Sequence, residues 1–330
     1  MKALIAQRLS GIAALAADDI AAPKPGPGEV LIAVGAGGVH LADIAALMGE
    51  RHPRPSLPFI PGLEAAGLVA AVGAEVTSLA PGDRIAAFMS WGGLAEGAVA
   101  QADLCAKLPD TIPLSLGASL PMAFAGALLA LRDRARLAAG ETLLVLGAGG
   151  YTGIAAVQIG KKLGARVIAV AAGEARGSEA VESGADELID GSAKPLSESV
   201  AALTAGNGVD VIYDPVGGDA FEMAVMTLAI GGRMISAGFA AGRVPRINMS
   251  AIYARDAELL AANTLLTVQK YPAHARAALN DVIAWTVDGS IRPRIAVQFP
   301  LSGATPAFDY ISSRRGSGAV IITIGKEGVA

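Results

Sequence analysis

Short runs of apolar residues alternate with turn-forming residues over the first hundred positions of the chain. Val30–Val34 follows a Gly-Glu pair, and Ile85–Phe88 follows Pro81-Gly82-Asp83-Arg84. Apolar runs of this length, bounded by glycine, proline and charged residues, predict β-strands. Their regular spacing predicts a mainly antiparallel, barrel-like domain over residues 1–120.

From residue 121 to residue 261 the pattern changes, because apolar runs now alternate with segments of helical periodicity. We predict strands at 143–147, 166–171, 187–189, 209–213 and 232–237. Strands that alternate with helices indicate a doubly wound α/β domain with a parallel sheet. A helix at 272–288 and strands at 295–299 and 319–324 then follow. These most simply return to the first domain, which would comprise residues 1–120 and 262–330.

Composition narrows the class of protein. The chain has 330 residues, of which 53% are apolar and 17% are charged, with a net charge of −4. This charge argues against a nucleic-acid partner. Thr111–Leu131 and Thr142–Gly160 carry no charge, but they contain prolines or glycines and fit a buried core better than a membrane. One cysteine, Cys105, and the absence of a visible signal peptide predict a cytoplasmic protein.

A glycine-rich turn joins the strand at 143–147 to the helical pattern that begins near Ile154. It fits A-x-G-x-x-G, with Ala148, Gly150 and Gly153 in the three fixed places and Gly149, Tyr151 and Thr152 between them. Gly150 permits close approach of a pyrophosphate, and Gly153 permits close packing of the helix on the sheet. The start of the helix supplies partial positive charge. This strand, turn and helix predict a dinucleotide site.

Several further motifs accompany this turn. They are Gly38-Val39-His40-Leu41-Ala42-Asp43, Leu57–Gly67, Val72–Thr77 with Gly82-Asp83-Arg84, Gly184-Ala185-Asp186, Val209–Gly218 and Gly238–Arg243. With them the chain closely resembles the medium-chain dehydrogenase/reductase superfamily, and most of all its zinc-independent NADPH:quinone oxidoreductase branch. The resemblance implies a GroES-like β-barrel lobe plus a Rossmann domain, with the active site in the cleft between them. It also implies a homodimer that continues the Rossmann sheet across an edge.

Two ligand positions of the zinc-dependent members are changed in this chain. His40 stands where those members have a cysteine, and Leu63 stands where they have a histidine. His40 and Glu64 leave two candidate ligands at most, whereas a catalytic zinc site usually has three. We therefore expect no metal. Alcohol oxidation is then disfavoured, because no Lewis acid would stabilise an alkoxide. A zinc alcohol dehydrogenase remains the lesser alternative.

The choice of cofactor depends on the end of the second Rossmann strand. An NAD-specific site has an acid there that accepts from the ribose 2′-hydroxyl. This chain has Ala172 and Gly173, and its first acid is Glu174. The resemblance implies that Arg176 and Arg314 bind the adenosine phosphate end, and a guanidinium suits a phosphate. We expect NADPH rather than NADH.

The resemblance also places residues at the reacting end of the cofactor. Gly126, Phe239, Asn263 and Thr264 would contact the nicotinamide, and His40, Asp43 and Tyr151 are the catalytic candidates. Small side chains, Gly126 among them, predict a wide apolar site.

Two of the catalytic candidates leave alternatives open. His40 could act as a general acid or only fill the vacated ligand position, and we favour solvent as the main proton source. Tyr151 could crowd the pyrophosphate or bond to it or to a substrate.

Two functions of different classes fit this sequence. The first is a zinc-independent, NADPH-dependent reductase that transfers hydride to quinones or α,β-unsaturated carbonyls. The second is an NADPH-binding sensor or a crystallin-like protein with little catalysis. The unusual residues His40, Gly126 and Tyr151 motivate the second function. The sequence does not identify the acceptor.

Overall fold

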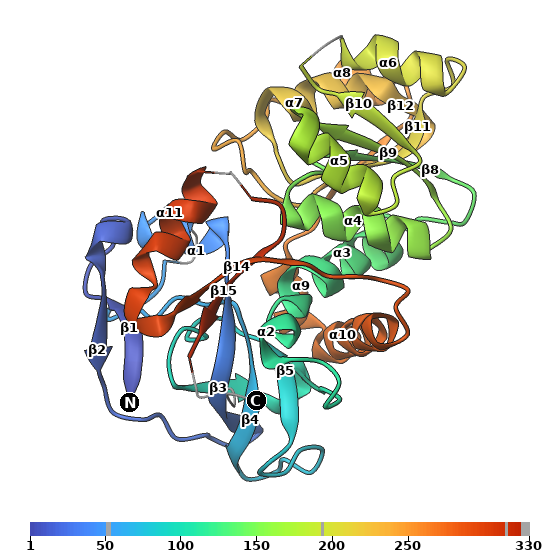
Figure 1. Cartoon of the computed structure of the whole chain (residues 1–330). Helices are drawn as coiled ribbons and strands as arrows, with labels where there is room; N and C mark the ends of the chain where they lie inside the picture. The colour runs from blue at the N-terminus through green and yellow to red at the C-terminus, as the bar shows by residue number, and fades with distance from the viewer. Residues whose placement is uncertain (51–53, 193–194, 314–315, 325–330) are drawn as a thin grey trace. The chain divides into compact units, whose positions relative to one another are not determined.

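The computed structural model describes residues 1–50, 54–192, 195–313 and 316–324, and the chain forms two compact units (Figure 1). The first unit comprises Met1–Met122, Val268–Gly289 and Pro293–Ala330, and the second comprises Ala123–Thr267 and Ser290–Arg292. The sequence predicts domain boundaries at residues 121 and 261.

The first unit is built around a seven-stranded sheet. Its elements are β1 (Lys2–Ala6), η1 (Ile12–Ala14), β2 (Leu15–Asp19), β3 (Glu29–Val39), α1 (Leu41–Leu47), β4 (Glu64–Val72), β5 (Arg84–Phe88), β6 (Gly97–Gln101), η2 (Ala102–Leu104), β7 (Cys105–Lys107), α2 (Leu114–Gly117), α10 (Pro272–Val287), β14 (Ile295–Pro300), η6 (Leu301–Gly303), α11 (Thr305–Ser313) and β15 (Ala319–Thr323). The sheet order is β14-β15-β3-β4-β5-β7, with β6 also paired to β3. Only β14 and β15 pair in parallel. The predicted antiparallel domain is confirmed.

Buried and more exposed residues alternate along β3, and this pattern shows which side chains of the sheet reach the core. Val30, Ile32 and Val34 are buried, whereas the residues between them are exposed or half-buried. The three buried side chains join one apolar cluster with residues of β4 and β5, among them Val69 and Ile85. Side chains of a strand point alternately to its two faces, so every second residue reaches the core.

The second unit alternates strands and helices along the chain. Its elements are the π-helical turns η3 (Leu120–Ala125) and η4 (Leu129–Arg134), α3 (Gly126–Leu128), β8 (Thr142–Leu146), α4 (Tyr151–Lys162), β9 (Arg166–Ala171), α5 (Glu174–Glu182), β10 (Glu187–Asp190), α6 (Leu196–Leu203), β11 (Val209–Asp214), α7 (Gly218–Ala224), η5 (Val225–Thr227), β12 (Leu228–Ser236), α8 (Met249–Tyr253), β13 (Glu258–Ala261) and α9 (Thr264–Lys270). The first residues of η3 and the last of α9 belong to the first unit.

All six strands of the second unit are parallel, in the order β10-β9-β8-β11-β12-β13. Helix α4 packs against β8 and β9, and α5 packs against β9 and β10 (Figure 1). The chain first adds β9 and β10 on one side of β8. It then crosses the sheet and adds β11, β12 and β13 on the other side of β8. This is the doubly wound Rossmann topology that the sequence predicts, with its switch point between β8 and β11. The five predicted strands are confirmed, and the short β13 completes the sheet.

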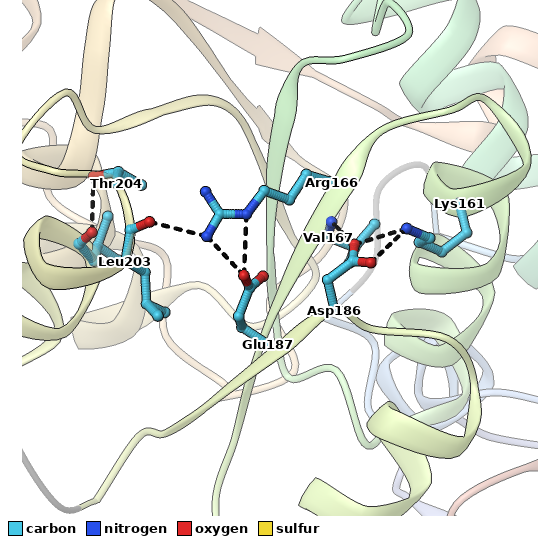
Figure 2. A network of polar contacts seen from close by, with 8 residues as sticks. Lys161, Arg166, Val167, Asp186, Glu187, Leu203 and Thr204 are labelled. Atoms are coloured by element: carbon cyan, nitrogen blue, oxygen red, sulfur yellow. Dashed lines mark hydrogen bonds and ion pairs between the residues drawn. The ribbon is translucent and has the colours of Figure 1, made fainter.

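A polar network joins the amino ends of β9 and β10 (Figure 2). The Arg166 guanidinium donates to Glu187 at 2.7 Å and to the carbonyl of Leu203 at 2.9 Å. Lys161 donates to both carboxylate oxygens of Asp186 at 2.7 Å. These pairs lie at the opposite edge of the sheet from the carboxyl ends, where ligands of such sheets bind. We therefore assign them a structural role.

The helical turns from Leu114 to Arg134 are long and apolar enough to cross a membrane, but 89% of their most apolar window is buried within the structure. Burial of this extent is typical of a core helix. This burial supports the prediction that the uncharged stretch Thr111–Leu131 belongs to the core rather than to a membrane.

Candidate cofactor site and active-site residues

The glycine-rich turn leads directly from β8 into α4. Gly147 has a φ of 59°, a left-handed conformation that favours glycine, and Gly150 precedes the first residue of α4. A Cβ atom at Gly153 would lie 2.7 Å from the Cα of Ala148, which no backbone could tolerate without moving. Gly153 therefore lets the start of α4 approach the turn. The start of an α-helix carries partial positive charge, which favours an anion at this position.

The other predicted cofactor residues also follow the carboxyl ends of strands. Ala172 and Gly173 follow β9, Phe239 follows β12, and Asn263 and Thr264 follow β13. Because the strands are parallel, these positions lie along one edge of the sheet, the edge where Rossmann domains bind their ligands.

Arg176 lies directly against the glycine-rich turn. A Cβ atom at Gly149 would stand 2.6 Å from the carbonyl oxygen and 2.8 Å from the Cα of Arg176. The absence of a side chain at Gly149 therefore lets the first turn of α5 pack on the turn after β8. This contact brings the predicted 2′-phosphate ligand beside the predicted pyrophosphate loop.

One carboxylate also stands at this end of the site. Asp190 is the last residue of β10, and its pKa lies below the usual range because it accepts hydrogen bonds from Ser192 and from the backbone of Gly173. An ionised acid beside Gly173 opposes a 2′-phosphate and favours a ribose hydroxyl. Asp190 is not among the residues predicted from the sequence, because it ends the third strand of the unit rather than the second.

Tyr151 is the first residue of α4, and its ring packs on Phe124. The ring centroids are 5.8 Å apart and the planes are inclined at 65°, an edge contact. Phe124 is fully buried and Tyr151 is half-buried. Edge contacts of this kind stabilise aromatic pairs. The ring of Tyr151 is thus held by η3, while its backbone stays part of the glycine-rich turn.

The turn after β11 supports both the glycine loop and the loop after β12. The buried carboxylate of Asp214 accepts from the backbone of Val216 at 2.8 Å and of Gly217 at 3.0 Å. Burial raises its pKa, and these hydrogen bonds act in the opposite direction. A Cβ atom at Gly147 would lie 2.7 Å from the Val216 side chain. Asp214 therefore fixes the turn that packs on the glycine loop.

Phe239 belongs to a loop that is tied to the same turn. Ala240 donates to the carbonyl of Pro215 at 3.1 Å, and Gly218 donates to the carbonyl of Arg243 at 3.0 Å. Half of the Phe239 side chain remains exposed at the carboxyl edge of the sheet. The loop is therefore fixed at its base, and the exposed part of the Phe239 ring adds apolar surface at this edge.

Asn263 directly precedes helix α9. Its side-chain oxygen accepts from the backbone N–H of Leu266 at 3.2 Å, and its carbonyl accepts from Thr267. These are the contacts of a helix-capping residue. Asn263 thus fixes the direction of the chain where β13 gives way to α9.

In the first unit, His40 forms a hydrogen-bonded group with two buried acids. Its Nε2 lies 2.7 Å from Oε1 of Glu64, and its backbone N–H donates to Asp43 at 2.8 Å. The His40 side chain also accepts from the backbone of Asp43 in a capping box at the start of α1. Nδ1 is then the acceptor, so Nε2 carries the hydrogen that is donated to Glu64. Both ring nitrogens have partners.

The carboxylates of Asp43 and Glu64 also have hydrogen-bond partners within the protein. Asp43 is completely buried and accepts from the backbone of Gly62 at 2.9 Å in addition to His40. Glu64 is 1% exposed, and its second oxygen accepts from the backbone of Met122 at 2.7 Å. Such carboxylates hold backbone segments in place. This geometry fits a positioning role for Asp43 better than the catalytic role predicted from the resemblance.

The donor set of this group does not fit zinc. Among residues 1–50, 54–192, 195–313 and 316–324, no three His, Cys, Asp or Glu side chains lie close enough to hold one ion. Leu63, at the second ligand position, is a fully buried hydrocarbon. A catalytic zinc needs a third protein ligand that these residues do not supply.

Comparison with known proteins places the chain in a family. Residues 152–279 match the family described as zinc-binding dehydrogenase, and residues 26–110 match the alcohol dehydrogenase GroES-like domain. Quinone oxidoreductase-like protein 2 of Bos taurus is 32% identical over 92% of this chain and 87% of the relative. The chain belongs to the medium-chain dehydrogenase/reductase superfamily, in its quinone oxidoreductase branch.

Other members of this superfamily match the chain over nearly its whole length. The quinone oxidoreductase of Sus scrofa is 32% identical over 93% of this chain and 92% of the relative. The crystal structure of Escherichia coli quinone oxidoreductase complexed with NADPH has a TM-score of 0.91 and 26% identity, covering 98% of this chain and 100% of that chain. The predicted family and fold class are confirmed, and the chain is an oxidoreductase of this superfamily.

The structure thus gathers most of the predicted cofactor residues at one edge of the Rossmann sheet and places His40 and Asp43 in the first unit. Arg314 lies outside the described residues. Cys105 is 2% exposed, and burial raises the pKa of its thiol to about 12, so it stays a protonated core residue. His40 and Glu64, which the sequence pairs as candidate ligands, are instead hydrogen-bonded to each other at 2.7 Å where β4 lies beside the start of α1.

Proposed function

We propose that this oxidoreductase is a zinc-independent, NADPH-dependent reductase of quinones or α,β-unsaturated carbonyls. The observation that carries the proposal is the glycine-rich turn at the carboxyl edge of the Rossmann sheet, packed against Arg176. The Escherichia coli relative complexed with NADPH supports it. The changed ligand positions at His40 and Leu63 support a reaction without zinc.

The residues of the second unit fit a dinucleotide phosphate. The backbone of Gly149–Thr152 and the start of α4 would hold the pyrophosphate, and Arg176 would hold the 2′-phosphate. Phe239, Asn263 and Thr264 would border the nicotinamide. When bound, NADPH supplies a hydride, and the protein supplies orientation and exclusion of water.

Cofactor preference should depend on Arg176. We expect Arg176→Ala to weaken NADPH binding by about tenfold to a hundredfold, the loss of a charge-assisted contact, and to leave NADH binding nearly unchanged. Fluorescence titration with both cofactors measures the two affinities. Equal losses would show that Arg176 does not contact the 2′-phosphate and would point to the ribose hydroxyl and Asp190.

His40 should orient rather than donate a proton, since Nδ1 and Nε2 both bond within the protein. General acid catalysis typically contributes about 10²–10⁴-fold in rate. We therefore expect His40→Asn, whose amide can also donate to Glu64, to lower the turnover rate by less than about tenfold. Steady-state kinetics at saturating NADPH check this. A thousandfold fall with intact NADPH affinity would instead make His40 the proton donor.

A panel of acceptors tests the proposal and its rival together. Small quinones and enones are mixed with the protein and NADPH, and the absorbance of the reduced cofactor is followed. We expect turnover with at least one class of acceptor. Tight NADPH binding with no turnover across the panel would favour a cofactor-binding sensor or crystallin-like protein.

We also propose a cytoplasmic homodimer with no nucleic-acid or membrane partner. Strand β13 ends the Rossmann sheet, so one side of its backbone has no strand partner among the described residues. Exposed edges of this kind pair readily with a second chain. Light scattering should give twice the chain mass, and a monomer would contradict the dimer.

A further inference from the structure

The three residues Ser290–Arg292 belong to a different unit from the elements on either side of them. Helix α10 and strand β14 are part of the first unit, whereas Ser290–Arg292 is part of the second. The chain also changes unit after Met122 and after Thr267, and each time it goes on to build further helices or strands there. Ser290–Arg292 adds no helix or strand to the second unit. This short segment therefore attaches the chain to the second unit without extending its fold.

The side chain of Gln158 holds this segment against helix α4. Its Oε1 accepts from the backbone N–H of Arg292 at 2.6 Å, and its Nε2 donates to the backbone carbonyl of the same residue at 3.2 Å. Lys162, one turn further along α4, donates to Oγ of Ser290 at 2.8 Å, and Ile291 is 1% exposed. Gln158 itself is 9% exposed. A buried amide is costly unless its hydrogen bonds are made, and Gln158 makes both with one residue of the segment.

Helix α4 is also the helix that begins at the glycine-rich turn. Gln158 lies about two turns after Tyr151, the first residue of α4. The predicted phosphate ligands therefore stand at one end of the helix, and the attached segment lies further along it. The His40 group belongs to the first unit. Through Ser290–Arg292, the chain of the first unit is thus tied to the helix that bears the predicted cofactor turn.

From this arrangement we infer that Gln158 is a positioning residue for hydride transfer, because it ties the first unit to the helix that carries the cofactor. The inference rests on the proposed function. NADPH binding depends on the predicted ligands of the second unit, whereas the reaction also depends on the His40 group of the first. A misplacement of about 1 Å, caused far from the reacting atoms, can lower a rate by about a hundredfold. Gln158 therefore acts on the rate and not on cofactor affinity.

The first experiment compares rate with affinity in one variant. Gln158→Met keeps an unbranched side chain of similar length and removes both hydrogen bonds to Arg292. We expect the turnover rate at saturating NADPH and acceptor to fall by about tenfold to a hundredfold, while the dissociation constant of NADPH changes by less than about twofold. Steady-state kinetics and fluorescence titration measure the two quantities. Gln298→Met, the same exchange at an exposed position of β14, is the matched control and should change neither.

A second measurement follows the attachment itself and needs no activity. The backbone N–H of Arg292 is held by Gln158, so its hydrogen should exchange with deuterium slowly in the unaltered protein. We expect this exchange to become about threefold to tenfold faster in Gln158→Met, the value of one neutral hydrogen bond, and to stay unchanged in Gln298→Met. Mass spectrometry of peptides that cover Arg292 measures the exchange.

The outcomes separate this inference from the proposed function. If the unaltered protein does not bind NADPH, or reduces no acceptor, the proposed function fails, and the exchange at Arg292 still decides whether Gln158 holds the segment. If the unaltered protein is active, an unchanged rate or an unchanged exchange in Gln158→Met overturns only the role of Gln158. Equal losses of rate and NADPH affinity would assign Gln158 to the support of α4 itself and would also overturn the inference.

Discussion

Replacement of Glu64 by alanine is expected to lower the free energy of unfolding by about 2 to 4 kcal/mol. Glu64 is 1% exposed and accepts from Nε2–H of His40 and from the backbone N–H of Met122, each at 2.7 Å. Each buried donor that loses its partner costs about 1 to 3 kcal/mol. Denaturant unfolding followed by circular dichroism measures the loss.

Two further variants test whether the loss of stability comes from the buried hydrogen bonds of Glu64. Glu64→Gln keeps the shape and one acceptor oxygen, so we expect about half of the loss seen with alanine. Glu50→Ala removes an exposed carboxylate from the same unit and should change the stability by less than about 0.5 kcal/mol. If Glu64→Ala unfolded like Glu50→Ala, the hydrogen-bonded group around His40 would not organise the first unit.

Gly153→Ala is expected to reduce NADPH affinity by about tenfold to a hundredfold. The new methyl group would stand 2.7 Å from the Cα of Ala148, so the turn between β8 and α4 must shift. Overpacking of this kind typically costs about 1 to 3 kcal/mol, and each 1.4 kcal/mol is about a tenfold change in affinity. Isothermal calorimetry with NADPH measures the change.

Gly150→Ala provides the comparison for this prediction. Its Cβ would lie 3.4 Å from the carbonyl oxygen of Gly147, and its φ of −86° suits any residue. The fold should therefore tolerate it, and any loss of affinity would report close approach of the pyrophosphate. Unchanged NADPH affinity in Gly153→Ala would mean that the cofactor does not bind at this turn.

Local patterns were enough to predict the framework of this protein. The apolar runs that form β8, β9 and β11 are strongly hydrophobic and end at glycine or acidic residues. Their predicted boundaries therefore lie close to the observed ones. The short edge strand β13 was not predicted separately, because four residues with a charged first position give little signal. Periodicity is informative for long buried strands and weak for short exposed ones.

The details of the site depend on contacts between residues that are far apart in sequence. Glu64 meets His40 only because β4 and the end of β3 pair in the folded sheet. The Thr264 side chain packs against Gly126 only because α9 begins just after β13 ends. The sequence brings His40 and Glu64 together as ligand positions, but no local pattern shows which hydrogen bonds they make. Sequence therefore identified the family, the fold and the glycine-rich turn, whereas the hydrogen bonds of the site required the structure.

The central claim is that this protein transfers hydride from the nicotinamide of NADPH to an organic acceptor. The most direct measurement uses NADPH deuterated at C4 on one face or the other, with an acceptor from the quinone and enone panel. A bound nicotinamide presents one face, so we expect the oxidised cofactor to lose all deuterium from one labelled form and retain all of it from the other. Retention or partial loss of deuterium in both forms would contradict enzymatic hydride transfer.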